Sequence, residues 1–113
     1  MHEFAVTQSI LNIVLDEAKA AQASKITKIN LVIGELSGVV SDSVQFYFDF
    51  LSKGTPAEGA ALVFTKIPAR GRCRECGTTF NLEESDWTCP DCRSKALDIT
   101  EGRELFVESI EVN

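Results

Sequence analysis

The sequence lacks most of the parts from which enzymes and membrane proteins are built. Its 113 residues contain no apolar run of about 18 residues, so we expect no membrane-spanning segment. The first residues show no basic stretch followed by an apolar core, so no secretory signal is predicted. There is a single histidine, no glycine-rich loop to hold a phosphate, and no clear pair of carboxylates for acid–base chemistry. We therefore expect a cytoplasmic protein that is not an enzyme.

Basic residues are also scarce. The chain has 11 Lys and Arg against 17 Asp and Glu, which gives a net charge of −6. Residues 66–103 contain seven of each sign, so the whole negative excess lies on the remainder of the chain. Nucleic-acid-binding proteins normally carry a basic stripe. Arg70, Arg72 and Arg74 alternate along the chain, but nearby acids offset them, and the composition disfavours nucleic acid as a partner.

All four cysteines lie in two Cys-x-x-Cys pairs, with twelve residues between the pairs. The first pair is Cys73 and Cys76, and the second is Cys89 and Cys92. Each pair can form a tight turn that directs two sulfurs at one point, and Gly77 suits the first of these turns. Two such turns facing each other surround a metal with four thiolates at metal–sulfur distances of about 2.3 Å.

Zinc is the interpretation that this cysteine pattern favours, in a structural role. Four sulfurs leave no open coordination position, so the site stabilises a segment too small to bury its own core. Iron in a rubredoxin-like cage uses the same ligands, and a redox pair is a further alternative. Two disulfides would require an oxidising compartment, for which the sequence carries no signal.

The hydrophobic pattern predicts an α+β fold. Asp42 is expected to cap the second helix, with Gln45 completing a capping box, and Phe80 and Trp87 are expected to pack over the cysteine pairs. The expected architecture is a small mixed three-stranded sheet with two helices, plus an inserted zinc-ribbon lobe. Helices are predicted over 4–21 and 43–51, and strands over 26–33, 62–67 and 104–112. The predicted domains are residues 1–68 together with 103–113, and the zinc ribbon of residues 69–102, which is inserted before the last strand.

The first three residues form a second candidate metal site. His2 holds the only imidazole of the chain, and it follows the α-amine of Met1 directly. The amine, the backbone nitrogen of His2 and its imidazole can close fused chelate rings on one ion, with the amide nitrogen of Glu3 in a fourth place. Such a planar, nitrogen-rich site suits Ni(II) or Cu(II) rather than zinc.

With these motifs together, the whole chain resembles the HypA/HybF family of hydrogenase nickel-incorporation proteins. The resemblance rests on Met1-His2-Glu3 opening a helix, on Ile33-Gly34-Glu35, on the turn Ala57-Glu58-Gly59-Ala60, and on the two cysteine pairs with Pro90 inside the second. It implies a nickel metallochaperone that delivers Ni(II) to the large subunit of [NiFe]-hydrogenase.

The resemblance also implies where each metal binds and which partners the protein meets. Nickel, the transient cargo, falls on the Met1 amine, the amide and ring of His2 and the Glu3 amide, within the main α/β domain. Structural zinc falls on the four cysteines. The implied partners are the GTPase HypB, the hydrogenase large subunit and, in some bacteria, urease accessory proteins, but neither nucleic acid nor a membrane. The protein is expected to be a monomer or a weak homodimer. The alternative is a zinc-ribbon interaction module that binds nucleic acid or a protein partner.

The sequence departs from the family pattern at one place. Some relatives carry an acidic residue near the nickel in the loop after the first strand. Here the aligned position is Val40, and the nearest acid is Asp42, which is expected to be occupied as a helix cap. An axial nickel ligand is therefore not assigned.

Overall fold

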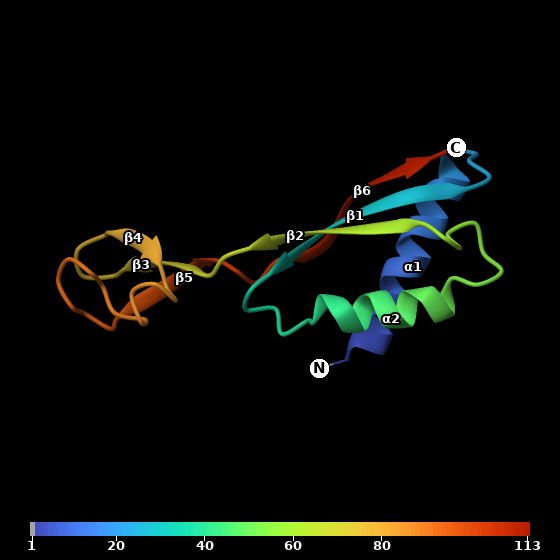
Figure 1. Ribbon diagram of the computed structural model, residues 1–113. Helices are drawn as coiled ribbons and strands as arrows, with labels where there is room; N and C mark the ends of the chain where they lie inside the picture. The colour runs from blue at the N-terminus through green and yellow to red at the C-terminus, as the bar shows by residue number, and fades with distance from the viewer. Residues whose placement is uncertain (1) are drawn as a thin grey trace.

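The chain forms two small three-stranded sheets joined end to end, with two helices covering one of them (Figure 1). This arrangement comes from a computed structural model that describes residues 2–113. The elements, in chain order, are α1 (Glu3–Ala20), β1 (Ile26–Gly34), α2 (Ser41–Leu51), β2 (Ala61–Ile67), β3 (Arg70–Cys73), β4 (Thr79–Asn81), β5 (Leu97–Glu101) and β6 (Leu105–Val112).

The larger sheet has the strand order β2-β1-β6 and is mixed, as the sequence predicted. β1 pairs parallel with β2, and α2 makes the crossover that two parallel neighbours require. β6 returns after the second sheet and pairs antiparallel with β1 on the other side. The strand predicted to follow the cysteine-rich segment therefore completes the first sheet.

A single apolar core lies between this sheet and the two helices. Ile29 and Leu31 of β1 pack against Val14 of α1 and Phe48 of α2, and all four are at most 2% exposed. The neighbouring residues of β1 face the other way because strand side chains alternate. On that side the Asn30 amide donates to the Ser109 hydroxyl at 2.9 Å, while Val32 is buried at 5% exposure, so the second face is mixed in character.

Three aromatic residues on the helices have a large exposed fraction. Phe46 and Phe50 are 69% and 66% exposed, because they lie on the outer side of α2 while Phe48 points inward. Phe4 is 45% exposed and packs edge-on against Tyr47, with ring centroids 5.4 Å apart. The aromatic residues of α2 are therefore divided between its core face and its exposed face.

The predicted capping box at the start of α2 is wrong. The helix begins at Ser41, with Val40 in the capping position and no side-chain hydrogen bond that caps it. Asp42 lies inside the first turn, where its charge still favours the helix dipole. The Gln45 amide instead donates to the Asp49 carboxylate at 2.8 Å, one turn further along the helix.

The smaller sheet, in the order β4-β3-β5, carries the cysteine pairs. Its core is small and consists of Phe80, Leu82 and Ala69 with two of the cysteines. Phe80 packs in this core as predicted, at 8% exposure. Trp87 does not, because it is 39% exposed in a turn where its own φ is positive. We call this sheet and its loops, residues 70–101, the cysteine lobe.

Hydrogen bonds connect the two sheets where the chain crosses between them. The Glu35 carboxylate accepts the N–H of Ala69 at 2.9 Å, and Leu36 donates to the carbonyl of Gly102 at 2.6 Å. Gly34 must be a glycine, because a Cβ there would overlap the backbone of Gly102. The molecule is elongated, with extents of 55 × 25 × 17 Å, and the cysteine lobe forms one end (Figure 1). Within residues 2–113, neither helix combines the length and apolar character needed to cross a membrane.

Candidate metal centre

The four cysteine sulfurs converge on one point in the cysteine lobe. All four lie within 4.8 Å of one another, and the Cys73–Cys92 and Cys76–Cys89 sulfur pairs are 3.5 Å apart. A tetrahedron with metal–sulfur bonds of about 2.3 Å has sulfurs about 3.8 Å apart, so the spacing fits one metal ion. None of the four cysteines forms a disulfide.

Two matching turns position these sulfurs. In the first, Gly77 donates to the carbonyl of Cys73, and in the second Arg93 donates to the carbonyl of Cys89, both at 2.9 Å. Gly77 and Arg93 occupy the same place in their turns and both have positive φ, of 79° and 65°. The predicted glycine turn is thus confirmed, while its counterpart in the second pair is an arginine in a conformation that normally favours glycine.

The acidities of the thiols favour a cation between them. The hydroxyl and N–H of Thr78, together with Cys89, lower the pKa of Cys76 to about 6. For Cys92 the N–H of Ser94 favours the thiolate, but the other sulfurs, chiefly Cys73, and desolvation raise its pKa to about 12. Four sulfurs this close cannot all ionise without a positive ion among them, and a bound metal supplies that charge.

Thr78 is a residue that the sequence analysis missed. Its hydroxyl lies 3.2 Å from the Cys76 sulfur and 2.7 Å from the Asp91 carboxylate, which bridges the two cysteine turns. The hydroxyl accepts from the Cys76 thiol and donates its one proton to Asp91. When a metal makes Cys76 a thiolate, the same hydroxyl can turn its proton to the sulfur, stabilising and orienting it. No sequence motif indicates this role, because Thr78 and Asp91 are 13 residues apart and come into contact only when both turns have formed.

The predicted nickel ligands lie at the start of α1, away from the cysteine lobe (Figure 1). Met1 lies outside the described residues. His2 is exposed and immediately precedes the helix, its carbonyl accepts the N–H of Val6, and its side chain makes no capping bond. The N–H groups of His2 and Glu3 belong to the helix end, where no intrahelical acceptor is available.

Glu3 connects this end of α1 to the loop after β1. One oxygen of its carboxylate accepts the N–H of Val40 at 3.2 Å. The N–H groups of Glu3 itself and of Val40 lower the pKa of this carboxyl below its ordinary value of 4.5. The structure thus brings Val40 into contact with one of the predicted nickel-binding residues.

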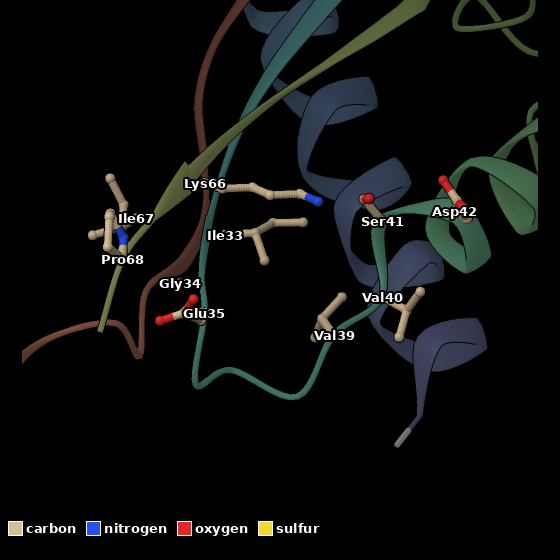
Figure 2. Close-up of a pocket in the computed structure, with 10 residues that line it drawn as sticks. All are labelled: Ile33, Gly34, Glu35, Val39, Val40, Ser41, Asp42, Lys66, Ile67 and Pro68. Atoms are coloured by element: carbon tan, nitrogen blue, oxygen red, sulfur yellow. The ribbon is translucent and has the colours of Figure 1, made fainter. Parts of the chain in front are cut away.

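A cavity of about 490 Å³ opens on the other side of this loop, at the carboxyl ends of β1 and β2 (Figure 2). Lys66 extends from β2 across the cavity toward Ser41 at the start of α2. Asp42, the acid considered as an axial nickel ligand, also lines it. The cavity therefore lies between the start of α2 and the crossing to the cysteine lobe.

Comparison with known proteins finds a family model and several relatives that match nearly the whole chain. The family model described as HypA, hydrogenase/urease nickel incorporation, metallochaperone, matches residues 1–112. A hydrogenase maturation factor HypA of Dehalococcoides mccartyi is 48% identical over 113 residues, covering 100% of this chain and 95% of that protein. A factor of the same name from Caldanaerobacter subterraneus is 43% identical, covering 99% of each chain.

Solved structures agree with the sequence relatives. The solution structure of the Ni metallochaperone HypA from Helicobacter pylori has a TM-score of 0.69 at 28% identity and covers 99% of this chain and 97% of that one. A second solution structure, of HypA protein, has a TM-score of 0.75 at 28% identity, covering 100% and 97%. The similarity extends over both sheets and both helices.

Proposed function

The chain belongs to the HypA family of hydrogenase/urease nickel-incorporation metallochaperones, and on this premise we propose that it binds Ni(II) at its amino terminus and delivers it to a nickel enzyme. Membership of this family makes it a maturation factor and not an enzyme, as the missing catalytic residues predicted. Its proposed destination is the large subunit of [NiFe]-hydrogenase, and urease is a second candidate because the family description names both enzymes.

One observation carries the proposal for the nickel site. The only imidazole of the chain, on His2, is exposed at a helix start, where the N–H groups of His2 and Glu3 have no intrahelical acceptor. The two amides can therefore lose their protons to a metal without breaking a helix bond. With the imidazole and the Met1 amine they form a planar four-nitrogen site that suits Ni(II).

The same geometry suggests how nickel is released. The amine, the imidazole and both amides bind nickel only after they lose protons, so acid competes with the metal. Glu3 supplies a second means, because its carboxylate is held by the N–H of Val40. A partner that pulls on the 37–40 loop would move Glu3 and distort the plane of donors.

The cysteine lobe holds zinc in this proposal. The four sulfurs fit a closed tetrahedral site, and zinc would supply the charge that lets all four ionise. The lobe core is too small to be stable alone, so the ion acts as a structural crosslink. Reduced cysteines in a metal-binding arrangement suit the cytoplasm, where we place the protein.

We further propose that the GTPase HypB is the partner that assists nickel transfer, with urease accessory proteins as additional partners. The negative excess outside residues 66–103 would steer a partner with a basic surface toward the unit that carries His2. Such steering predicts an association rate that falls as salt concentration rises. The cysteine lobe has seven acidic residues against five basic ones, and this charge argues against nucleic acid.

The nickel proposal is tested by calorimetric titration of Ni(II) into three forms of the chain. These are the native chain, the His2→Gln variant, and a chain whose amino terminus is extended by three alanines, which moves the α-amine too far from the imidazole for both to join one set of fused chelate rings. We expect both altered forms to lose at least about tenfold in affinity, because each removes or displaces a chelating nitrogen.

The native chain should also show the visible absorption of planar amide-bound nickel, which both altered forms should lose. Substitution of Lys25, an exposed residue in the loop before β1, by glutamine is the control and should change nothing. Unchanged affinity in both altered forms, or retention of the chain on nucleic acid at low salt, would favour the alternative of a zinc-ribbon interaction module.

A further inference from the structure

An apolar groove runs between α1 and the start of β6. It has a volume of about 340 Å³, and its lining residues are mostly apolar, namely Ala5, Val6, Ser9, Ile10, Ile13, Leu105, Phe106 and Val107. Two of the large side chains are partly exposed, with Ile13 at 46% and Leu105 at 38%. The groove thus presents to solvent apolar surface that the core does not use.

The groove lies beside an open sheet edge. In the strand order β2-β1-β6, β6 has a neighbour on one side only within the described chain (Figure 1). The N–H of Gly34 donates to the carbonyl of Glu104, and antiparallel pairing alternates, so Glu104 and Phe106 point their polar backbone groups at β1. Leu105 and Val107 therefore turn their N–H and carbonyl groups to the open edge.

The open edge is short, and its end is marked by a bulge. The register between β1 and β6 shifts between Asn30 and Leu31, which makes Glu108 the extra residue on β6. Bulges and charged side chains are devices that stop an edge strand from pairing. On β6 they protect the second half of the strand and leave Leu105–Val107, the stretch that lines the groove, free to pair.

We propose that this edge and groove together dock an extended segment of a partner protein, which adds a strand to β6 at Leu105–Val107. Its backbone would pair with the free groups of Leu105 and Val107, while alternate side chains would enter the apolar groove over α1. This mode needs both an edge and a pocket beside it, and the structure supplies both at the same three residues of β6.

Charge indicates the composition of that segment. The two elements that frame the groove carry an excess of acid. On α1 there are Glu3, Asp16 and Glu17 against Lys19, and on β6 there is Glu108, since the other acid, Glu111, is paired with Lys28 at 3.5 Å. We therefore expect a segment with small or branched apolar residues at alternate positions and lysine or arginine at its ends.

A second copy of this chain fits the edge less well. Two β6 strands that pair antiparallel through the free groups of Leu105 and Val107 must be centred on Phe106. That register sets Glu104 of one copy opposite Glu108 of the other at both ends of the contact. Like charges directly opposite each other destabilise a strand pair, so a basic partner segment is favoured.

The docking proposal does not depend on nickel, although the two sites are adjacent. Ala5 and Val6, at one end of the groove, lie within a turn of His2 and Glu3. A segment held there would bring its partner close to the proposed cargo. A chain extended at its amino terminus should still bind the segment, so the two proposals can fail separately.

The test uses a capped peptide of sequence lysine–valine–threonine–valine–threonine–valine–lysine, titrated into the full zinc-loaded chain and followed by amide chemical shifts. We expect the largest shifts at Leu105–Val107 and along the groove side of α1. Two further peptides carry N-methyl groups on the valine amides or on the threonine amides. Only one of the two should lose binding, because every second N–H of a strand faces a given neighbour.

Matched variants separate the backbone contact from the groove. Leu105→Pro removes an outward N–H at the first residue of the strand, where proline is tolerated, while Leu105→Ala loses the side chain but keeps the N–H. We expect the proline variant to bind at least about tenfold more weakly than the alanine variant. Ile13→Asn should weaken binding similarly, and Val63→Asn, which is equally exposed on the β2 edge, should not.

Three outcomes would overturn the proposal. Equal binding of both N-methylated peptides would exclude strand addition. Equal binding of a peptide with glutamate in place of lysine would remove the charge argument. Dimerisation of the chain that blocks the peptide and is lost in Leu105→Pro would assign the edge to a second copy.

Discussion

At the scale of single residues, the cysteines and the histidine are the clearest signals, because few other roles explain them. The Cys-x-x-Cys spacing predicted four converging sulfurs, and the structure brings them within 4.8 Å. The residues that tune the site were not predictable. Thr78 and Asp91 are ordinary polar residues until the two turns face each other and place the hydroxyl 3.2 Å from Cys76.

The contact of Thr78 with Cys76 leads to a prediction about metal affinity. Thr78→Val keeps the shape of the side chain and the backbone bond from Cys73 but removes the hydroxyl. The thiolate of Cys76 loses a polar neighbour, so we expect zinc affinity to fall by about 10- to 100-fold, the usual range for such supporting groups. Competition with a coloured chelator measures it.

The next residue in the chain provides the control for this measurement. Thr79 is exposed on β4, and Thr79→Val should leave zinc affinity unchanged. If the two variants bind zinc equally well, the hydroxyl of Thr78 has no part in the site.

At the scale of elements, the hydrophobic pattern predicted the two helices and the three strands of the first sheet. It did not predict the residue at which α2 begins or how that helix is capped. Asp42 and Gln45 have the spacing of a capping box, yet the helix starts two residues earlier than predicted, after Val40, whose N–H is held by the Glu3 carboxylate from α1. A contact from a distant part of the chain thus overrides a local preference. It also leaves α2 without a side-chain cap.

A missing cap can be supplied by substitution. Val40→Asn places an amide where it can accept an N–H of the first turn of α2, and Val40 is 54% exposed, so little packing is lost. We expect the free energy of unfolding to rise by about 1 kcal/mol relative to Val40→Ala, which removes the same side chain without adding a cap. Urea unfolding of both variants measures the difference. Equal midpoints for the two would show that the asparagine makes no cap.

At the scale of the whole molecule, the chain consists of two sheets with separate cores joined by a pair of crossings. Both crossings are tied to the end of β1, through Glu35 to Ala69 and through Leu36 to Gly102. These hydrogen bonds favour a defined orientation of the cysteine lobe, and the predicted domain division at 69 and 102 remains a proposal.

Metal removal tests that division directly. A strong chelator should unfold the cysteine lobe, because its few buried residues cannot offset the entropy of ordering it without the ion. The helical circular dichroism should persist, since the 18 residues of α1 and the 11 of α2 pack on the other sheet. Amide spectra should lose dispersion only for residues 70–101, and added zinc should restore it. Loss of both units together would mean that the chain is one cooperative domain.

The sequence by itself determined the local chemistry of this protein: four sulfurs in two tight turns, one imidazole beside the chain end, and the alternation that builds each strand. These depend on spacing over a few residues, which the covalent chain enforces. The tertiary structure alone decided which distant residues meet. Gly34 lies against Gly102, Glu3 holds Val40, and Leu105 opens an edge beside Ile13. Those contacts follow from strand order and packing, which local spacing does not encode.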